Sequence, residues 1–216
     1  MKTILRSIAV LFTIFATTSG FSQTAGTTSD DTRYDFKIGV KAGLNVSNVY
    51  DEQNNDYVAE NKVGFVGGGF LSIPITKFVG FQPEILYSEK GFKATKSTIL
   101  GNYEFTRTST YLDIPLQLQI KPIPFVTILA GPQFSYLLKT KNDFNGNITS
   151  TEEENINSEN YKKNIFGFVV GADVNVNNFI ISGRAGWDIS KTDTNGDSSK
   201  PRYKNQVLQV TLGYAF

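Results

Sequence analysis

Apolar and polar side chains alternate at successive positions through much of the chain. The C-terminal segment shows this most cleanly. Its apolar positions are Leu208, Val210, Leu212, Tyr214 and Phe216. A β-strand turns successive side chains to opposite faces, so a period of two predicts a strand with one apolar face. The same split recurs over 36–46 and 112–120.

Applied along the whole chain, the pattern predicts eight strands. They lie at about 35–47, 62–74, 78–92, 104–121, 125–141, 163–176, 179–191 and 203–216. Short connections at 74–77, 122–124 and 177–178 alternate with long polar ones at 48–61, 93–103, 142–162 and 192–202. In an up-and-down barrel this order places every short turn at one end. Outer-membrane barrels have short periplasmic turns and long extracellular loops, so we expect an eight-stranded antiparallel transmembrane β-barrel.

The apolar face decides between a membrane barrel and a soluble one, because it meets lipid in the first and forms a core in the second. Phe, Leu and Ile occupy this face on every predicted strand and would overfill a small barrel if they pointed inward. Aromatic residues also gather near both strand ends, as in the girdles at lipid–water boundaries. Those near the turns are Phe36, Phe78, Phe81, Phe179 and Phe216, and those near the loops are Tyr87, Tyr111, Tyr136, Phe166 and Trp187. These features favour the membrane barrel.

The N-terminus has the order of a secretory signal peptide. Lys2 and Arg6 precede the short apolar run at 8–16, and small residues follow. We expect residues 1–23 to be this signal, 24–34 to be a disordered polar lead-in, and 35–216 to form the outer-membrane barrel. The terminal Phe216, with Tyr214 and Leu212 on the same face, is the expected insertion signal, with barrel-insertion machinery as its partner.

Five strings follow one another along the chain: GVKAGLN, GFVGGGF, GFQPEILYSEKGFK, YLDIPLQLQIKP and AGPQFSYLL. Together they resemble the PorT-like outer-membrane β-barrel domain family of the Bacteroidetes, over roughly 35–216. The resemblance implies an outer-membrane barrel in such a bacterium. The member that gives the family its name is associated with a secretion and gliding apparatus, and most relatives have no assigned activity.

Composition excludes several kinds of chemistry. The chain has neither cysteine nor histidine, so thiolate sites, disulfides and imidazole-based catalysis or metal binding are impossible. Its 21 basic and 20 acidic residues nearly cancel, which gives no reason to expect nucleic acid as a partner. We expect no cofactor, no resident metal and no enzymatic activity.

The predicted inward face carries six charged residues that are candidates for a lumen network. They are Lys41, Glu84, Asp113, Asp173, Arg184 and Asp188. An acid–base site is one interpretation, but a charge-balanced plug that pairs buried groups is the simpler one. Bulky inward residues should narrow the lumen further: Val66, Phe70, Leu86, Leu129 and Val169.

Two loop motifs suggest ligands only weakly. Asp193 to Asp197 is similar to the start of a calcium loop, but Ser198 stands where that loop requires glycine. The acidic run Glu152–Glu154 fits a solvated loop apex, although it could contact a cation or a partner.

The predicted function is a structural or interaction role in the cell envelope, linked in its sharper form to a secretion assembly. Outer-membrane lipid and an envelope protein that meets the outer loops are the expected partners. A narrow channel or transport accessory is the alternative, followed by an outer-membrane enzyme and then by a soluble periplasmic ligand-binding barrel.

The membrane barrel can be tested by the effect of heating on the mobility of the protein in SDS gels. A folded barrel extracted from outer membranes in mild detergent should run faster on SDS gels unboiled than boiled. A soluble protein without a mobility shift would overturn the outward assignment of the apolar face.

Overall fold

The barrel unit spans Thr32–Phe216 in a computed structural model. The structure describes residues 32–53, 58–98, 101–145, 150–154, 164–189 and 202–216. The predicted signal segment 1–23 lies outside the described residues, as do residues 24–31 of the predicted lead-in. The last three lead-in residues, expected to be disordered, instead form the 3-10 helix η1 (Thr32–Tyr34), with Arg33 buried.

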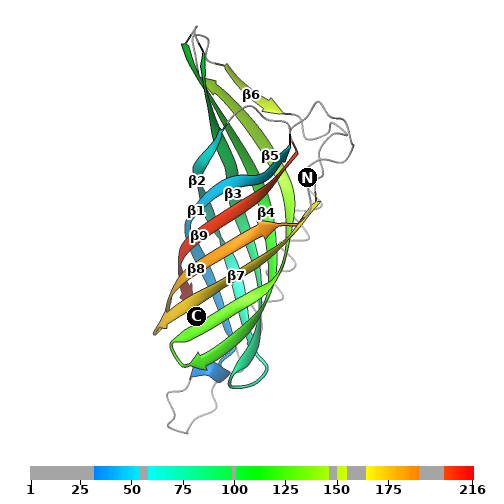
Figure 1. Ribbon diagram of the computed structural model, residues 1–216. Coiled ribbons are helices and arrows are strands. Elements are labelled where there is room, and N and C mark those ends of the chain that lie inside the picture. Colours follow the sequence, from blue (N-terminus) through cyan, green and yellow to red (C-terminus); the bar gives the residue numbers. More distant parts are fainter. Residues whose placement is uncertain (1–31, 54–57, 99–100, 146–149, 155–163, 190–201) are drawn as a thin grey trace, which may run out of the picture. The chain divides into compact units, whose positions relative to one another are not determined.

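Strands make up almost all of the described chain (Figure 1). In chain order they are β1 (Lys37–Gln53), β2 (Val58–Pro74), β3 (Val79–Thr98), β4 (Gly101–Ile123), β5 (Val126–Asn145), β6 (Ser150–Glu154), β7 (Asn164–Val176), β8 (Phe179–Asp188) and β9 (Arg202–Ala215). No helix in these ranges has the length and apolar character needed to cross a bilayer.

All strands except β6 form a closed antiparallel ring. Each pairs with its neighbour in sequence, β5 with β7, and β9 returns to β1. The β1–β9 ladder runs from Gly39 opposite Ala215 to Gln53 opposite Arg202. The predicted eight-stranded up-and-down barrel is therefore confirmed.

The short turns lie where the alternation predicts them. Asn177 and Asn178 alone connect β7 to β8, and Asn177 has a φ of 53°. Asparagine tolerates this left-handed conformation, which two-residue hairpin turns require. At 75–78 the amides of Ile75 and Thr76 donate to the Val79 carbonyl at 2.9 and 2.8 Å. Because these turns are so short, few backbone amides and carbonyls at this end need hydrogen-bond partners outside the strands.

Three of the predicted long loops are wrong in extent. The segments at 48–61 and 93–103 are strand over most of their length, and 142–162 contains the end of β5 and all of β6. The backbone ladder continues beyond the lipid, but the side chains there no longer need an apolar face, so the alternation fades. The predicted loop 192–202 lies outside the described residues except for Arg202.

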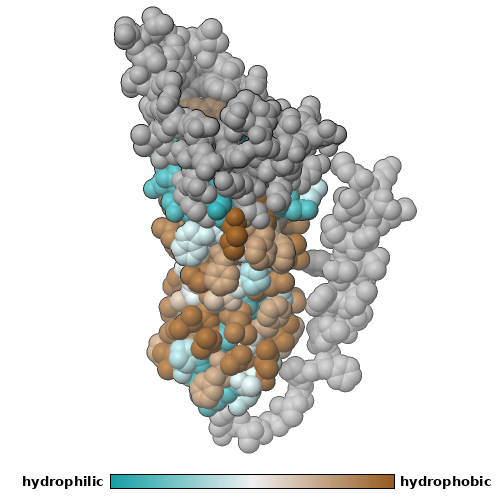
Figure 2. Space-filling model, turned by 45° about the vertical axis from the view of Figure 1, so that its right-hand side comes forward, coloured by the Kyte–Doolittle hydropathy of each residue, from teal (hydrophilic) through white to brown (hydrophobic). Residues whose placement is uncertain are grey.

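The two faces of the barrel differ as the alternation predicts. Large apolar side chains are exposed on the outside, and Figure 2 shows them as a hydrophobic surface over the strands. Val210, for example, is 64% exposed, whereas its neighbour Thr211 is 2% exposed. Polar residues and a few bulky apolar ones fill the inside. Gly39 makes room there, because a Cβ at this position would collide with the Phe70 ring.

Most of the aromatic residues predicted for the two girdles are exposed on the outside of the barrel, but Tyr111 is not. Exposed rings near the turns include Phe36, Phe78 and Phe179. Tyr111, predicted in the loop-end girdle, instead points inward and is 2% exposed. It packs with Leu137 and Ile165. The same alternation that turns Leu112 outward turns Tyr111 inward, so its aromatic character misled the assignment.

Because the outer face lies in lipid, replacing one of its residues by a charged one should destabilise the barrel more, the closer the residue lies to the middle of the membrane. Val210 lies opposite Gly183 in the middle of β8. Val210→Arg should therefore destabilise the barrel by about 2–4 kcal/mol, against about 0–1 kcal/mol for Ile75→Arg in the exposed turn. Urea unfolding of the two variants in lipid vesicles measures the difference. Equal costs would contradict the placement of β9 in lipid.

Candidate functional site

The middle of the lumen holds a cluster of four charged side chains. Lys41 on β1 reaches across β2 to β3, where its Nζ lies 2.6 Å from Glu84 Oε1. Glycines occupy the positions opposite Lys41 on both neighbouring strands, Gly68 and Gly213. Because glycine has no side chain, these positions leave the lysine room to cross the lumen.

Arg184 joins Glu84 to a second carboxylate. Its Nη1 lies 2.6 Å from Asp173 Oδ1, and its Nη2 lies 3.8 Å from Glu84 Oε1. Gln82 adds a further donor, since its Nε2 lies 2.7 Å from Glu84 Oε1. Two bases and two acids therefore balance in this cluster. The low dielectric constant of the interior strengthens the attraction within such pairs. It also makes a buried charge whose partner is removed strongly destabilising.

A second charged group lies on the loop side of the first. Lys90 Nζ is 2.9 Å from Asp113 Oδ2, and it lies 5.0 Å from the centre of the Tyr111 ring. Asp188 Oδ2 accepts a hydrogen bond of 2.6 Å from Asn205 Nδ2. The two groups meet around a cavity of about 10 Å³ that both Arg184 and Asp188 line.

All six predicted lumen residues are buried, with 2–5% of each exposed. The structure brings Lys41, Glu84, Asp173 and Arg184 into one cluster. Asp113 and Asp188 lie in the other group, where their partners Lys90 and Asn205 were not among the predicted site residues. Lys90 could have been found, because it shares the inward parity of Glu84. The bulky lumen residues predicted from sequence are also buried.

The arrangement favours a structural role for these charged residues over a catalytic or metal-binding one. Each carboxylate named above lies within hydrogen-bonding or ion-pairing distance of a cation or an amide. Among the described residues, no group of three or more acidic, His or Cys side chains is placed to hold a metal ion. The calcium-like segment at 193–197 lies outside the described residues, and of Glu152–Glu154 the structure describes the backbone. The role of the six residues as a lumen plug stays a prediction.

The C-terminal residues of the expected insertion signal share the outward face of β9. Leu212, Tyr214 and Phe216 are all exposed there. The Tyr214 ring lies 5.3 Å from that of Phe179 and 5.1 Å from that of Phe216. The Phe216 amide donates to the Ile38 carbonyl at 2.8 Å, so the strand is paired to its end. Its role in insertion is not tested by these contacts.

The family described as "Outer membrane protein beta-barrel domain" matches residues 21–194. The chain belongs to this family. It is an outer-membrane protein, and the apolar outside of its barrel lies in lipid. No curated protein matches the sequence.

Solved outer-membrane proteins include folds similar to this one. Ail, the attachment invasion locus protein of Yersinia pestis, is 14% identical, covers 84% of this chain and 99% of its own, and has a TM-score of 0.47. Neisserial surface protein A is 12% identical, with coverages of 83% and 97% and a TM-score of 0.48. OprG from Pseudomonas aeruginosa is 11% identical, with coverages of 83% and 95% and a TM-score of 0.41.

The central cluster predicts a large penalty for removing one partner. Glu84→Gln leaves two buried cations without this carboxylate and should cost about 3–5 kcal/mol of unfolding free energy. The double variant Lys41→Met/Glu84→Gln should cost less than the sum of its single changes, as urea unfolding in vesicles can measure.

The half-exposed pair Lys141–Asp143, with 3.0 Å between Nζ and Oδ1, provides the control. Lys141→Gln should cost less than about 1 kcal/mol. Additive effects of Lys41→Met and Glu84→Gln would show that the two side chains are not coupled.

Proposed function

We propose that this barrel is an interaction protein of the cell envelope that presents a rigid strand extension to a partner outside the membrane. The extension consists of the parts of β2 to β5 beyond the apolar surface, together with β6. The observation that carries the proposal is the open edge of β6. The short turns lie at the opposite end, which is the periplasmic end in barrels of this kind.

The extension is a continuous sheet. Pairing of β3 with β4 runs to Thr98 opposite Gly101, and pairing of β4 with β5 runs to Glu104 opposite Asn145. Figure 1 shows that β3, β4 and β5 extend well beyond the ends of β7 and β8. Interstrand hydrogen bonds hold the sheet in one shape, so a partner would meet it without first ordering a loop.

The strand β6 leaves an edge at one side of this sheet. Its residues pair with β5 over 140–144, whereas the lower part of β5, 126–136, pairs with β7. In the described part of the chain, no strand pairs with the other edge of β6. Unpaired backbone amides and carbonyls at such an edge can add a strand from another chain.

The filled lumen supports an interaction role over a channel. The charged clusters and inward apolar side chains cross the interior, and the cavities that Lys90 and Lys121 line measure about 10 and 30 Å³. A water molecule needs about 10–15 Å³, so the smaller cavity holds at most one water-sized group and the larger about two. Transport and enzymatic roles remain the weaker alternatives. A link to a secretion assembly rests on the resemblance to PorT-like proteins and is part of this proposal.

The test of the function is site-specific cross-linking on whole cells. A photoreactive residue at Glu153 on β6 should give an adduct of defined mass, and the same residue at Ile75 in the opposite turn should not give that adduct. The backbone pairing is then tested with Thr151→Pro and Glu152→Pro. Adjacent residues direct their amides to opposite edges of a strand, so the two changes should affect the adduct unequally.

Heat-modifiable migration provides the folding control for every variant. Absence of an adduct at Glu153, or the same adduct at Ile75, would contradict the proposal. Reproducible unit conductance of the wild-type protein in planar bilayers would favour the channel instead.

A further inference from the structure

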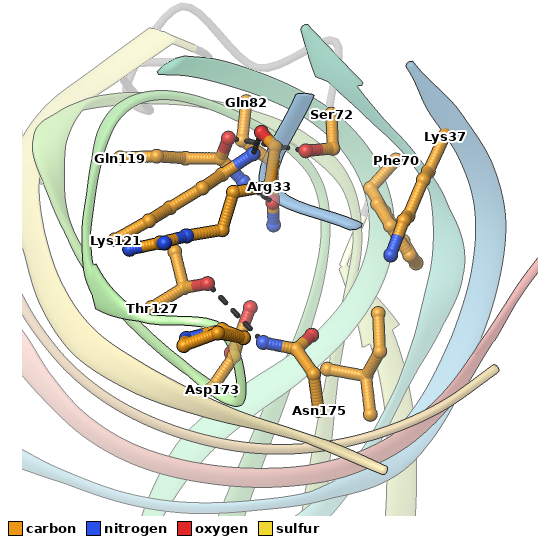
Figure 3. A pocket seen from close by; sticks show the side chains of 12 residues that line it. Arg33, Lys37, Phe70, Ser72, Gln82, Gln119, Lys121, Thr127, Asp173 and Asn175 are labelled. Atoms are coloured by element: carbon orange, nitrogen blue, oxygen red, sulfur yellow. Dashed lines mark hydrogen bonds between the residues drawn. The ribbon is translucent and has the colours of Figure 1, made fainter. Parts of the chain in front are cut away.

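The turn end of the lumen contains a cavity of about 30 Å³ that the plug does not fill. Figure 3 shows Arg33 and Lys121 reaching into it, with Lys37 at another side. The other side chains that line it are Phe70, Ser72, Gln82, Gln119, Pro124, Thr127, Asp173, Asn175 and Ile180. They come from η1, from the β4–β5 turn and from every barrel strand except β9.

Lys121 is the unusual member of this lining. It is 6% exposed, and its Nζ donates to the Arg33 backbone carbonyl at 3.2 Å. Lys41, Lys90 and Arg184 each have a carboxylate within 4.0 Å, but no described carboxylate lies that close to Lys121. A buried ammonium group loses its hydration, and a single neutral acceptor does not compensate for that loss.

Two acids lie near Lys121, and neither forms an ion pair with it. Asp35 acts on the ammonium electrostatically from beyond 4.0 Å and only partly offsets its charge. Asp173 lines the cavity, but its Oδ1 lies 2.6 Å from Arg184 Nη1. Lys37 and the guanidinium of Arg33 add further positive charge to the lining. The Cζ of Arg33 lies 5.2 Å from the centre of the Phe78 ring.

The hydrogen-bond inventory also leaves a surplus of donors. Gln119 Nε2 donates to Gln82 Oε1, and Ser72 Oγ donates to Gln119 Oε1 at 3.1 Å, so these amides are occupied. Thr127 Oγ1 accepts from Asn175 Nδ2 at 3.2 Å, which leaves its own proton available. An ammonium carries three protons, and the carbonyl of Arg33 accepts only one from Lys121.

We propose that this cavity is a binding site for a small oxyanion, a carboxylate or phosphate group that enters from the turn end. Its negative charge would pair with Lys121 and Lys37, and Thr127 would donate a further hydrogen bond. A volume of about 30 Å³ admits roughly two water-sized groups, which suits the two oxygens of a carboxylate or one edge of a phosphate. A larger molecule would insert only its acidic group.

The test uses protein purified from outer membranes in a non-ionic detergent without phosphate. Inorganic phosphate is titrated at constant ionic strength, and amide resonances of 121–127 and the Asn175 side chain are followed by NMR. The wild-type protein should show saturable shifts. Lys121→Gln should weaken binding about tenfold or more, as expected for a lost charge-assisted hydrogen bond.

Lys77→Gln is the matched control, because this lysine lies in the β2–β3 turn at the same end and does not line the cavity. It should bind as the wild type does. Should Lys121→Gln fail the heat-modifiability test, Lys37→Gln and Thr127→Val take its place, each with an expected weakening of several-fold. Absent shifts, or equal weakening by Lys77→Gln, would overturn the site.

Two further arms identify the source of the anion. Asp30 and Asp31 precede η1 in the sequence. Binding that appears only in the Asp30→Asn/Asp31→Asn variant would mean that this chain fills the cavity itself, which would overturn an external ligand. In phosphatidylcholine nanodiscs, shifts on adding phosphatidylglycerol would identify a lipid headgroup. Shifts with phosphate alone would identify a free anion.

Discussion

The structure depends on one constraint, which is that lipid offers no hydrogen bonds to the backbone. Every strand within the membrane must therefore pair on both edges, and the sheet must close. Closure gives each residue a fixed inward or outward direction. A slip of one residue in the register of β1 would turn Lys41 toward lipid and Val40 into the lumen. The apolar outside and the charged inside are two results of the same requirement.

The sequence predicts the strands correctly where lipid imposes this pattern, and their extent is not predictable where lipid does not. The alternation located every barrel strand, because each membrane-facing position must be apolar. Beyond the lipid, the ladder of β3 and β4 continues through threonine, lysine and serine, whose order carries no period. The strand β6 was missed for the same reason. Tyr111 shows a different error, in which residue type was given more weight than parity.

The sequence predicts which charged residues lie in the lumen, but it does not predict which of them form ion pairs with one another. Parity alone assigns Lys41, Glu84 and Arg184 to the lumen, and it would also have assigned Lys90. Pairing depends on which side chains can reach across the interior. Lys41 finds its carboxylate two strands away because glycines flank it. Lys121 lies near the end of β4. The sequence around it does not reveal that no carboxylate in the described part of the chain comes within 4.0 Å of its ammonium group.

The strand extension has a mechanical consequence. The strands β3, β4 and β5 run without a break from the turns to the tip of the sheet, so a load applied at the tip acts along them. Pulling in this direction shears many interstrand hydrogen bonds at once, whereas a load across the strands would open them one after another. A partner attached at the tip would thus be tethered to the whole barrel and held against forces that would peel away a loop.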